Sequence, residues 1–241
     1  MSKRFLVVLL LAGSLIGMGI YLFRALRPSA SRSMQVLEWL RHPQDHPEWA
    51  IQAGKRCGTA PFILPTDGLV GYLWDDSFKP GHRHQGVDIF AGTGVNETPV
   101  LAVADGYLTR LPEWKSSLII RIPQDPLQPD RQIWVYYTHL ADSAGNSFIA
   151  ADFPAGTSEK FVESGTLLGY QGNFSGDPNN PVGVHLHLSL VKDNGNGGFL
   201  NELEIRNTLD PSPYLGLSLN AKDYNGSLIQ CLSPSQSQGS G

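Results

Sequence analysis

Short runs of alternating or continuous apolar residues, separated by turns, dominate this chain. Because successive side chains of a strand point to opposite faces, such runs predict strands rather than helices. The ranges expected to form strands are 100–111, 117–122, 132–140, 166–171 and 184–192. Several short strands joined by glycine-rich turns predict a mainly β protein, either an antiparallel β-sandwich or a compact barrel-like sheet. Asp105 and Gly106 lie in the middle of the first run and predict a hairpin turn there.

Two histidines alternate with aliphatic residues in the last predicted strand. Residues 183–190 read Gly-Val-His-Leu-His-Leu-Ser-Leu, so His185 and His187 share one face and the leucines share the other. The leucine face is expected to enter the core. Two imidazoles on one face of a strand supply half of a metal site or half of an acid–base pair.

Two further histidines offer partners for this pair. His84 is followed by Asp88 four residues later, and His139 lies at the end of the run 132–140. A catalytic zinc takes three ligands from the protein and leaves one position for water. One histidine, one carboxylate and a second histidine complete such a set, and the remaining histidines are available to move protons. The sequence therefore indicates a metal hydrolase whose ligands lie on separate strands.

A long apolar run lies near the N-terminus. Lys3 and Arg4 precede residues 5–23, which carry no charge and end at Arg24. About 20 apolar residues span a bilayer as a helix, whereas a signal peptide has an apolar core of roughly 7–15 residues. No Ala-x-Ala site follows, although residues 31–33 offer small residues for cleavage. We favour an uncleaved transmembrane anchor over a cleaved signal, and the positive charges on both sides leave its orientation open.

These features divide the chain into four segments. They are a membrane anchor or signal segment (1–27), a linker with short helical pieces (28–56), the β domain (57–231) and a disordered tail of low complexity (232–241). Pro43 and Pro47 are expected to divide the helical pieces, which either pack on the main domain or form a stalk. His42 and His46 are expected to lie in solvent, with donation of a histidine to the metal as the alternative.

Cys57 and Cys231 are the only cysteines and lie at the two ends of the β domain. Distant cysteines of a cytosolic protein are usually unrelated thiols, but an even number after an export segment favours a disulfide. We therefore expect the pair to be bonded if the chain is exported.

Composition and charge exclude other classes of protein. The 241 residues carry a formal net charge of −4 and a pI of about 5.9, so the chain lacks the basic character of a nucleic-acid-binding protein. With 41% hydrophobic and 17% charged residues, it has the composition of a globular domain rather than a disordered chain.

The ordered set of motifs resembles the lysostaphin-type zinc metallopeptidases, which have a duplicated-hybrid-motif-like domain and cut peptide cross-links in bacterial cell walls. The resemblance is carried by His84-x-x-x-Asp88 and His185-x-His187. Further matching pieces are 86–89, 99–106, 137–140, 168–172 and 210–215. Each piece alone is weak, but the set in this order is specific.

This resemblance implies one zinc ion per chain, held by His84, Asp88 and His187, with His139 and His185 as catalytic residues. One catalytic histidine would take a proton from the metal-activated water and return it to the leaving amine. The other would hydrogen-bond the oxyanion, and the sequence leaves the assignment open. The implied fold is a small antiparallel β domain with an open groove.

Two features depart from this pattern. Residues 91–98 are longer than the usual short turn, so the groove wall there is expected to differ. His82 forms a second His-x-His with His84, but the family pattern and Arg83 beside it favour a position at the rim of the site.

The implied function is a zinc endopeptidase that hydrolyses stem peptides or cross-links of peptidoglycan. The alternative is a catalytically silent relative that binds peptidoglycan or activates an amidase; such relatives typically lack a ligand, and none is missing here. The expected partners are a peptidoglycan peptide and the membrane. The sequence does not identify an activating protein partner. The β domain is expected outside the cytoplasm, on the periplasmic or cell-wall side, or secreted if the N-terminal segment is cleaved.

Overall fold

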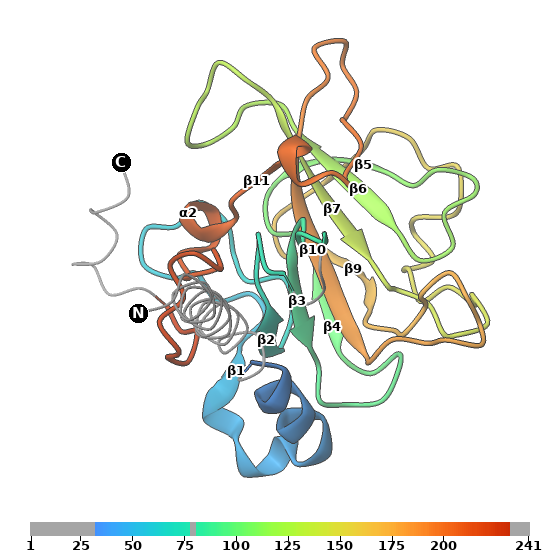
Figure 1. The fold of residues 1–241 in the computed structure, drawn as a ribbon. Helices are drawn as coiled ribbons and strands as arrows, with labels where there is room; N and C mark the ends of the chain where they lie inside the picture. The colour runs from blue at the N-terminus through green and yellow to red at the C-terminus, as the bar shows by residue number, and fades with distance from the viewer. Residues whose placement is uncertain (1–31, 78–80, 232–241) are drawn as a thin grey trace, which may run out of the picture.

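The protein is mainly β, as the pattern predicts. The computed structural model describes residues 32–77 and 81–231. Nine strands of these residues form one sheet, in which neighbouring strands are antiparallel (Figure 1). Along its main path the strands are β1 (Ala50–Ile51), β2 (Gly68–Tyr72), β3 (Val87–Phe90), β10 (His185–Lys192), β7 (Ile133–Thr138), β6 (Leu118–Ile122), β5 (Gly106–Thr109) and β8 (Lys160–Val162). The ninth strand, β11 (Thr208–Leu209), pairs with β10.

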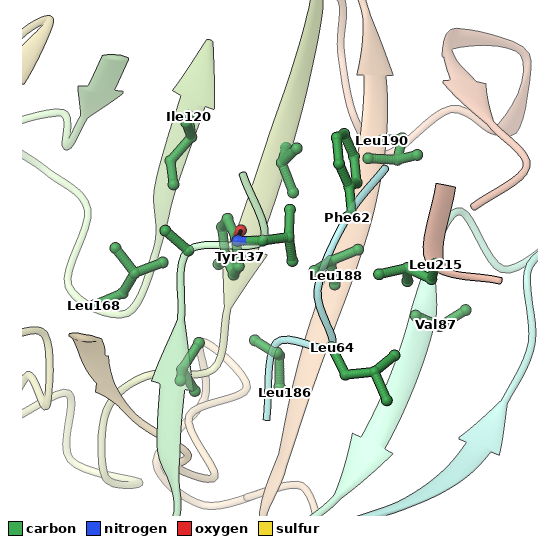
Figure 2. Close-up of a cluster of buried hydrophobic side chains, with 14 of the residues drawn as sticks. Phe62, Leu64, Val87, Ile120, Tyr137, Leu168, Leu186, Leu188, Leu190 and Leu215 are labelled. Carbon is green, nitrogen blue, oxygen red and sulfur yellow. Dashed lines mark hydrogen bonds between the residues drawn. The ribbon is translucent and has the colours of Figure 1, made fainter. Parts of the chain in front are cut away.

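A second sheet has only two strands, β4 (Pro99–Leu101) and β9 (Leu167–Tyr170). Buried Val100 and Leu168 of this small sheet join the same hydrophobic cluster as Leu186 of the large sheet. Figure 2 shows Leu168 facing the leucines of β10 across this cluster. Two antiparallel layers of very unequal size therefore enclose one core.

Strand β10 lies in the middle of the large sheet and has two distinct faces. Leu186, Leu188 and Leu190 are buried in the core (Figure 2). His185 and His187 project to the opposite face, since side chains alternate along a strand. The alternation predicted for this strand is confirmed.

The hairpin predicted at Asp105 and Gly106 is wrong. Strand β4 pairs with β9, whereas β5 pairs with β6 and β8, so the two halves of the run belong to different sheets. The chain crosses from the small sheet to the large sheet between Val100 and Leu108. Both residues are fully buried in the same core, which lies between the two sheets. A local turn signal cannot indicate this crossing, which depends on strands far along the chain.

Residues 32–41 are helical, and the 3₁₀ turns η1 (Pro43–Asp45) and η2 (Pro47–Trp49) follow. The helix packs on the main domain instead of forming a stalk. Buried Val36 and Trp39 cluster with Leu69 and Phe90, and the Trp39 indole N–H donates to the Phe90 carbonyl at 2.8 Å. The other helices among the described residues are short: η3 (Ile205–Asn207) and α2 (Ser212–Leu215).

The predicted anchor in residues 1–27 and the predicted tail lie outside the described residues. In the part of the chain that the structure describes, no helix combines the length and apolar character needed to cross a bilayer. Cys57 and Cys231 form a disulfide between positions 174 residues apart. The bond joins the segment between β1 and β2 to residues that follow α2 in the chain.

Candidate metal and catalytic site

The register of β10 brings two of the predicted ligands together. His187 is paired with Asp88 of β3 on one side and with Thr138 of β7 on the other. Directly opposed residues of antiparallel strands have Cβ atoms about 4.5–5.5 Å apart and project to the same side of the sheet. Asp88 and His187 are therefore brought side by side by strand pairing alone.

His84 joins them from a loop. It precedes β3, so the prediction that all ligands lie on strands is wrong for this residue. Its N–H donates to the Asp76 carbonyl, and its carbonyl accepts from the Asp75 N–H, each at 2.8 Å. These two bonds fasten the loop to the residues that follow β2. Ring Nδ1–H donates to the Leu73 carbonyl at 2.9 Å, which turns Nε2 towards Asp88.

Three donor atoms converge at the centre of this site. His84 Nε2 lies 3.1 Å from Asp88 Oδ1 and 3.0 Å from His187 Nδ1, and the last two atoms are 2.8 Å apart. Ligands about 2.0–2.1 Å from a tetrahedral zinc are about 3.3 Å from one another. The observed separations are close to this value. Two imidazoles and one carboxylate also leave a fourth position open, as in catalytic zinc sites.

In both His84 and His187, the ring nitrogen that is not one of the three converging donor atoms has a hydrogen-bond partner. His84 Nδ1 is bonded to the Leu73 carbonyl, and His187 Nε2 lies 2.8 Å from Ser189 Oγ. When His187 donates its Nε2–H to the hydroxyl, its lone pair is on Nδ1 and faces the other donors. Lone pairs this close repel unless a proton or cation lies between them. The group therefore fits a divalent ion, with its imidazoles oriented by partners outside the donor set.

His139 and His185 line the same side of the site, with ring centroids 4.4 Å apart. Their Nδ1 atoms lie 2.6 Å from the Phe174 carbonyl and 2.7 Å from the Gly183 carbonyl, respectively. A carbonyl only accepts, so each Nδ1 carries a proton and each Nε2 of the neutral ring carries a lone pair. His185 Nε2 lies 3.7 Å from Asp88 Oδ1, so it faces the three donor atoms.

The backbone of His139 has a φ of 72°, which is uncommon for a residue other than glycine. Such a conformation costs energy and is kept only where the surroundings hold it. Here the next residue donates its N–H to the Ser116 carbonyl at 3.0 Å, while the His139 ring is bonded to Phe174. The bend ends strand β7 and directs the ring into the site.

Burial and neighbouring charge set the protonation of these groups. Burial would raise the pKa of Asp88, but the surrounding histidines, His84 first, hold that pKa well below its usual range. Burial lowers the pKa of His185 to about 4, and it also lowers the pKa values of His139 and His187. Burial opposes the charge of His84 as well, but Asp88 outweighs it and raises the pKa of His84. His139 and His185 are therefore neutral at pH 7, as a general base must be.

The other histidines do not join the donor group that the described residues form. The His82 ring centroid lies 6.4 Å from that of His84, and His82 lines a separate surface cavity with Arg83. His82 therefore lies near His84 but does not line the cavity of the donor group, and its expected position at the rim of the site stays a prediction. His46 stacks on Trp49 with ring centroids 3.7 Å apart, and His42 is exposed.

Ser189 is the polar partner that sequence reasoning misses. Its side chain is fully buried, and its hydroxyl bonds the His187 ring. The signal for it was available, because a residue two positions after His187 lies on the same face of the strand.

Comparisons with known proteins give structural neighbours only. No family model matches the chain, and no curated protein matches it. The chain is similar to the catalytic domain of lysostaphin from Staphylococcus simulans, at 20% identity and a TM-score of 0.38, over 60% of this chain and 87% of that one. It is also similar to the longer lysostaphin chain, at 16% identity and a TM-score of 0.39, over 76% of this chain and 60% of the other.

A third neighbour is a mutant catalytic domain of the prophage-encoded protein EnpA from Enterococcus faecalis. It shares 22% identity at a TM-score of 0.35, over 63% of this chain and 94% of that domain. At these identities and TM-scores, none of the three assigns a function to this chain. The function proposed below therefore rests on the residues of the site.

Proposed function

We propose that this protein is a zinc-dependent endopeptidase of the lysostaphin type, which hydrolyses peptide bonds in stem peptides or cross-links of bacterial peptidoglycan. The observation that carries the proposal is the convergence of His84, Asp88 and His187 beside two neutral histidines. A purely structural metal site has no use for His139 and His185. A catalytically silent relative would have no need to keep all five groups together.

One zinc ion would be held by His84 Nε2, Asp88 Oδ1 and His187 Nδ1. When bound, zinc polarises the scissile carbonyl and lowers the pKa of a bound water towards about 7. The negative Asp88 partly offsets the charge of the ion. Ser189 and the Leu73 carbonyl hold the two imidazoles in the tautomers that present a lone pair.

His139 and His185 move the proton. Both Nε2 atoms begin as acceptors, because both Nδ1–H groups are bonded to backbone carbonyls. The imidazole that takes the water proton becomes an imidazolium, and its Nε2–H then protonates the leaving amine nitrogen. The second ring lies beside it, and its Nε2 also begins as an acceptor. If it takes a further proton from solvent, the resulting Nε2–H would hydrogen-bond the developing oxyanion, and the proton would return to solvent when the oxyanion collapses. The two roles are separable by the single alanine variants.

The test is mass-spectrometric analysis of fragments released from purified peptidoglycan by the zinc-loaded protein. We expect new peptide termini at one type of bond, and a stoichiometry of one zinc per chain. His187→Ala is the matched control, since it removes one ligand while leaving His139 and His185 in place. Absence of zinc from the purified protein, or no cleavage by protein that carries zinc, would reject the proposal.

We also propose that the β domain works outside the cytoplasm, attached to the membrane through its N-terminal segment. Support comes from the uncharged apolar run at 5–23 and from the disulfide between Cys57 and Cys231. Disulfides persist in oxidising compartments and are rare in the cytosol. Fractionation of cells should recover the protein with membranes, and external protease should digest the β domain while the membrane is intact. Recovery in the cytosolic fraction would contradict this location.

A further inference from the structure

The helix at residues 32–41 lies beside the candidate site and has two different apolar faces. Val36 and Trp39 are about 5% and 4% exposed and pack on the sheet. Leu37 and Leu40 are 45% and 38% exposed, although both are large aliphatic residues. Residues three or four apart lie on one side of a helix, so Leu37 and Leu40 form a single apolar strip.

The helix is held firmly in this position. Buried Arg32 forms a salt bridge with buried Asp76, directly beside the loop that carries His84. The Trp39 indole bonds the Phe90 carbonyl at the end of β3. Glycine at position 71 permits the close approach, because a Cβ there would lie 2.6 Å from both Val36 and Phe90. The strip of Leu37 and Leu40 is therefore presented on a fixed support.

One cavity of about 540 Å³ joins this strip to the candidate site. Its lining includes the donor residues and both catalytic histidines on one side, and Leu37, Leu40 and Val182 on the other. Phe90 connects the two parts, since its ring stacks on the His185 ring at a centroid distance of 4.9 Å. Gly183 keeps the passage open, because a Cβ there would lie 3.3 Å from Phe90 and 3.5 Å from Leu40.

The charge of the lining indicates what this part of the cavity accepts. Among the described residues that line it, Asp88 is the only carboxylate, and neither lysine nor arginine is present. Asp88 is engaged with His84 and His187. Among the described lining residues, no other charged group remains to pair with an acidic or basic side chain at the Leu37 end. An aliphatic side chain would instead bury the exposed leucine surface and gain free energy from doing so.

From this geometry we infer that Leu37, Leu40, Phe90 and Val182 form a specificity subsite for an aliphatic side chain adjoining the scissile bond. The inference rests on the proposed peptidase function and goes beyond it by naming the residues that select the substrate. A peptide with alanine or leucine next to the cut bond fills the subsite, whereas a glycine peptide leaves it empty. The enzyme therefore discriminates against glycine bridges.

The kinetic test uses quenched peptides that differ only at the residues flanking the central bond, with glycine, alanine or leucine in either configuration. We expect kcat/KM for the best aliphatic peptide to exceed that for glycine by about tenfold or more, since one methylene in an apolar pocket is worth roughly 10–200-fold. The double variant Leu37→Ser, Leu40→Ser should lose most of this preference. Gly183→Ala, which narrows the passage, should disfavour leucine more than alanine.

Met34→Ser is the matched control. Met34 lies on the same helix and is 65% exposed, but it does not line the cavity. The preference for aliphatic peptides should be unchanged in this variant. If the Leu37 and Leu40 changes accelerate cleavage of aliphatic and glycine peptides equally, the helix is a cover over the site and the subsite is refuted. An unchanged preference in the double variant refutes it as well.

A binding measurement separates this inference from the proposed function. Metal-free protein with labelled methyl groups is titrated with N-acetyl-leucine amide or N-acetyl-glycine amide. The leucine compound should shift the methyl resonances of Leu37 and Leu40, the glycine compound should not, and Met34 should stay unshifted. If these shifts occur but no peptide is cleaved, the peptidase proposal fails, and Leu37 and Leu40 belong to a site that binds aliphatic groups without selecting a bond to cut. If peptides are cleaved without preference and without shifts, the subsite fails and the peptidase proposal stands.

Discussion

Replacement of Ser189 by alanine tests how the site orients its metal ligands. The Ser189 hydroxyl lies 2.8 Å from His187 Nε2 and is fully buried. Ser189→Ala removes the acceptor that keeps the His187 proton on Nε2 and the lone pair on Nδ1. The His187 ring can then adopt the other tautomer, in which the proton on Nδ1 points at the position of the metal ion.

The expected effect is a 10–100-fold loss of zinc affinity, which is typical when a partner behind a metal ligand is removed. This range corresponds to about 1.4–2.8 kcal/mol of binding free energy. A loss near the upper end is expected, because the His187 ring is only 14% exposed and water has little access to replace the hydroxyl. Deleting one small oxygen should leave the folded structure intact.

The assay is competition for zinc between the metal-free protein and a fluorescent chelator of known affinity, with urea unfolding measured in parallel. Ser117→Ala is the control, since Ser117 bonds Tyr136 and Thr138 on the same face of the sheet and contacts no ligand. Wild-type affinity in Ser189→Ala would refute the orienting role. Equal losses in both serine variants would attribute the effect to general destabilisation.

Three further predictions concern proton transfer, pH and the disulfide. His139→Ala should keep bound zinc, measured by atomic absorption, but lose hydrolysis of peptidoglycan fragments by about 10²-fold or more, as expected for a general acid–base group; loss of zinc in this variant would make His139 a ligand instead. Because burial lowers the pKa of His185 from 6.5 to about 4, the unfolded state binds the proton first as the pH falls, so the metal-free protein should lose about 2 kcal/mol of unfolding free energy between pH 7 and pH 5 from this residue. Urea unfolding at the two pH values should show a smaller loss in His185→Gln, and an equal loss would contradict the assignment. Replacing Cys57 and Cys231 by serine should cost about 5 kcal/mol of unfolding free energy in the chain-entropy model, and reduction of the wild-type protein should reproduce the loss measured by urea unfolding.

Local patterns predicted the parts of the site that depend on a single strand. The alternation at 184–192 predicted β10 to within one residue, because one face of this strand packs in the core and the other does not. Strand pairing then places Asp88 opposite His187. This pairing joins residues far apart in the sequence, so no local pattern predicts it. The mainly β, antiparallel fold was likewise predictable from short runs and turns.

Long-range packing decides the features that the sequence could not indicate. The chain crosses between two sheets near Gly106, because the partners of β4 and β5 lie elsewhere in the sequence. The helix at 32–41 has an apolar pattern too short to predict where it docks. Its place beside the site depends on distant groups, namely Asp76 and the Phe90 carbonyl.

Because β10 is paired with β3 and β7, the arrangement of the site depends on the register of this strand in the sheet. Leucine and histidine alternate along this strand, so a slip of one residue would exchange the two sets between the faces. The imidazoles would then be buried in the hydrophobic core, and aliphatic side chains would occupy the position of the proposed metal site. A sheet with this register error would lose its core together with its site, so the packing that stabilises the fold also fixes the alignment of the ligands.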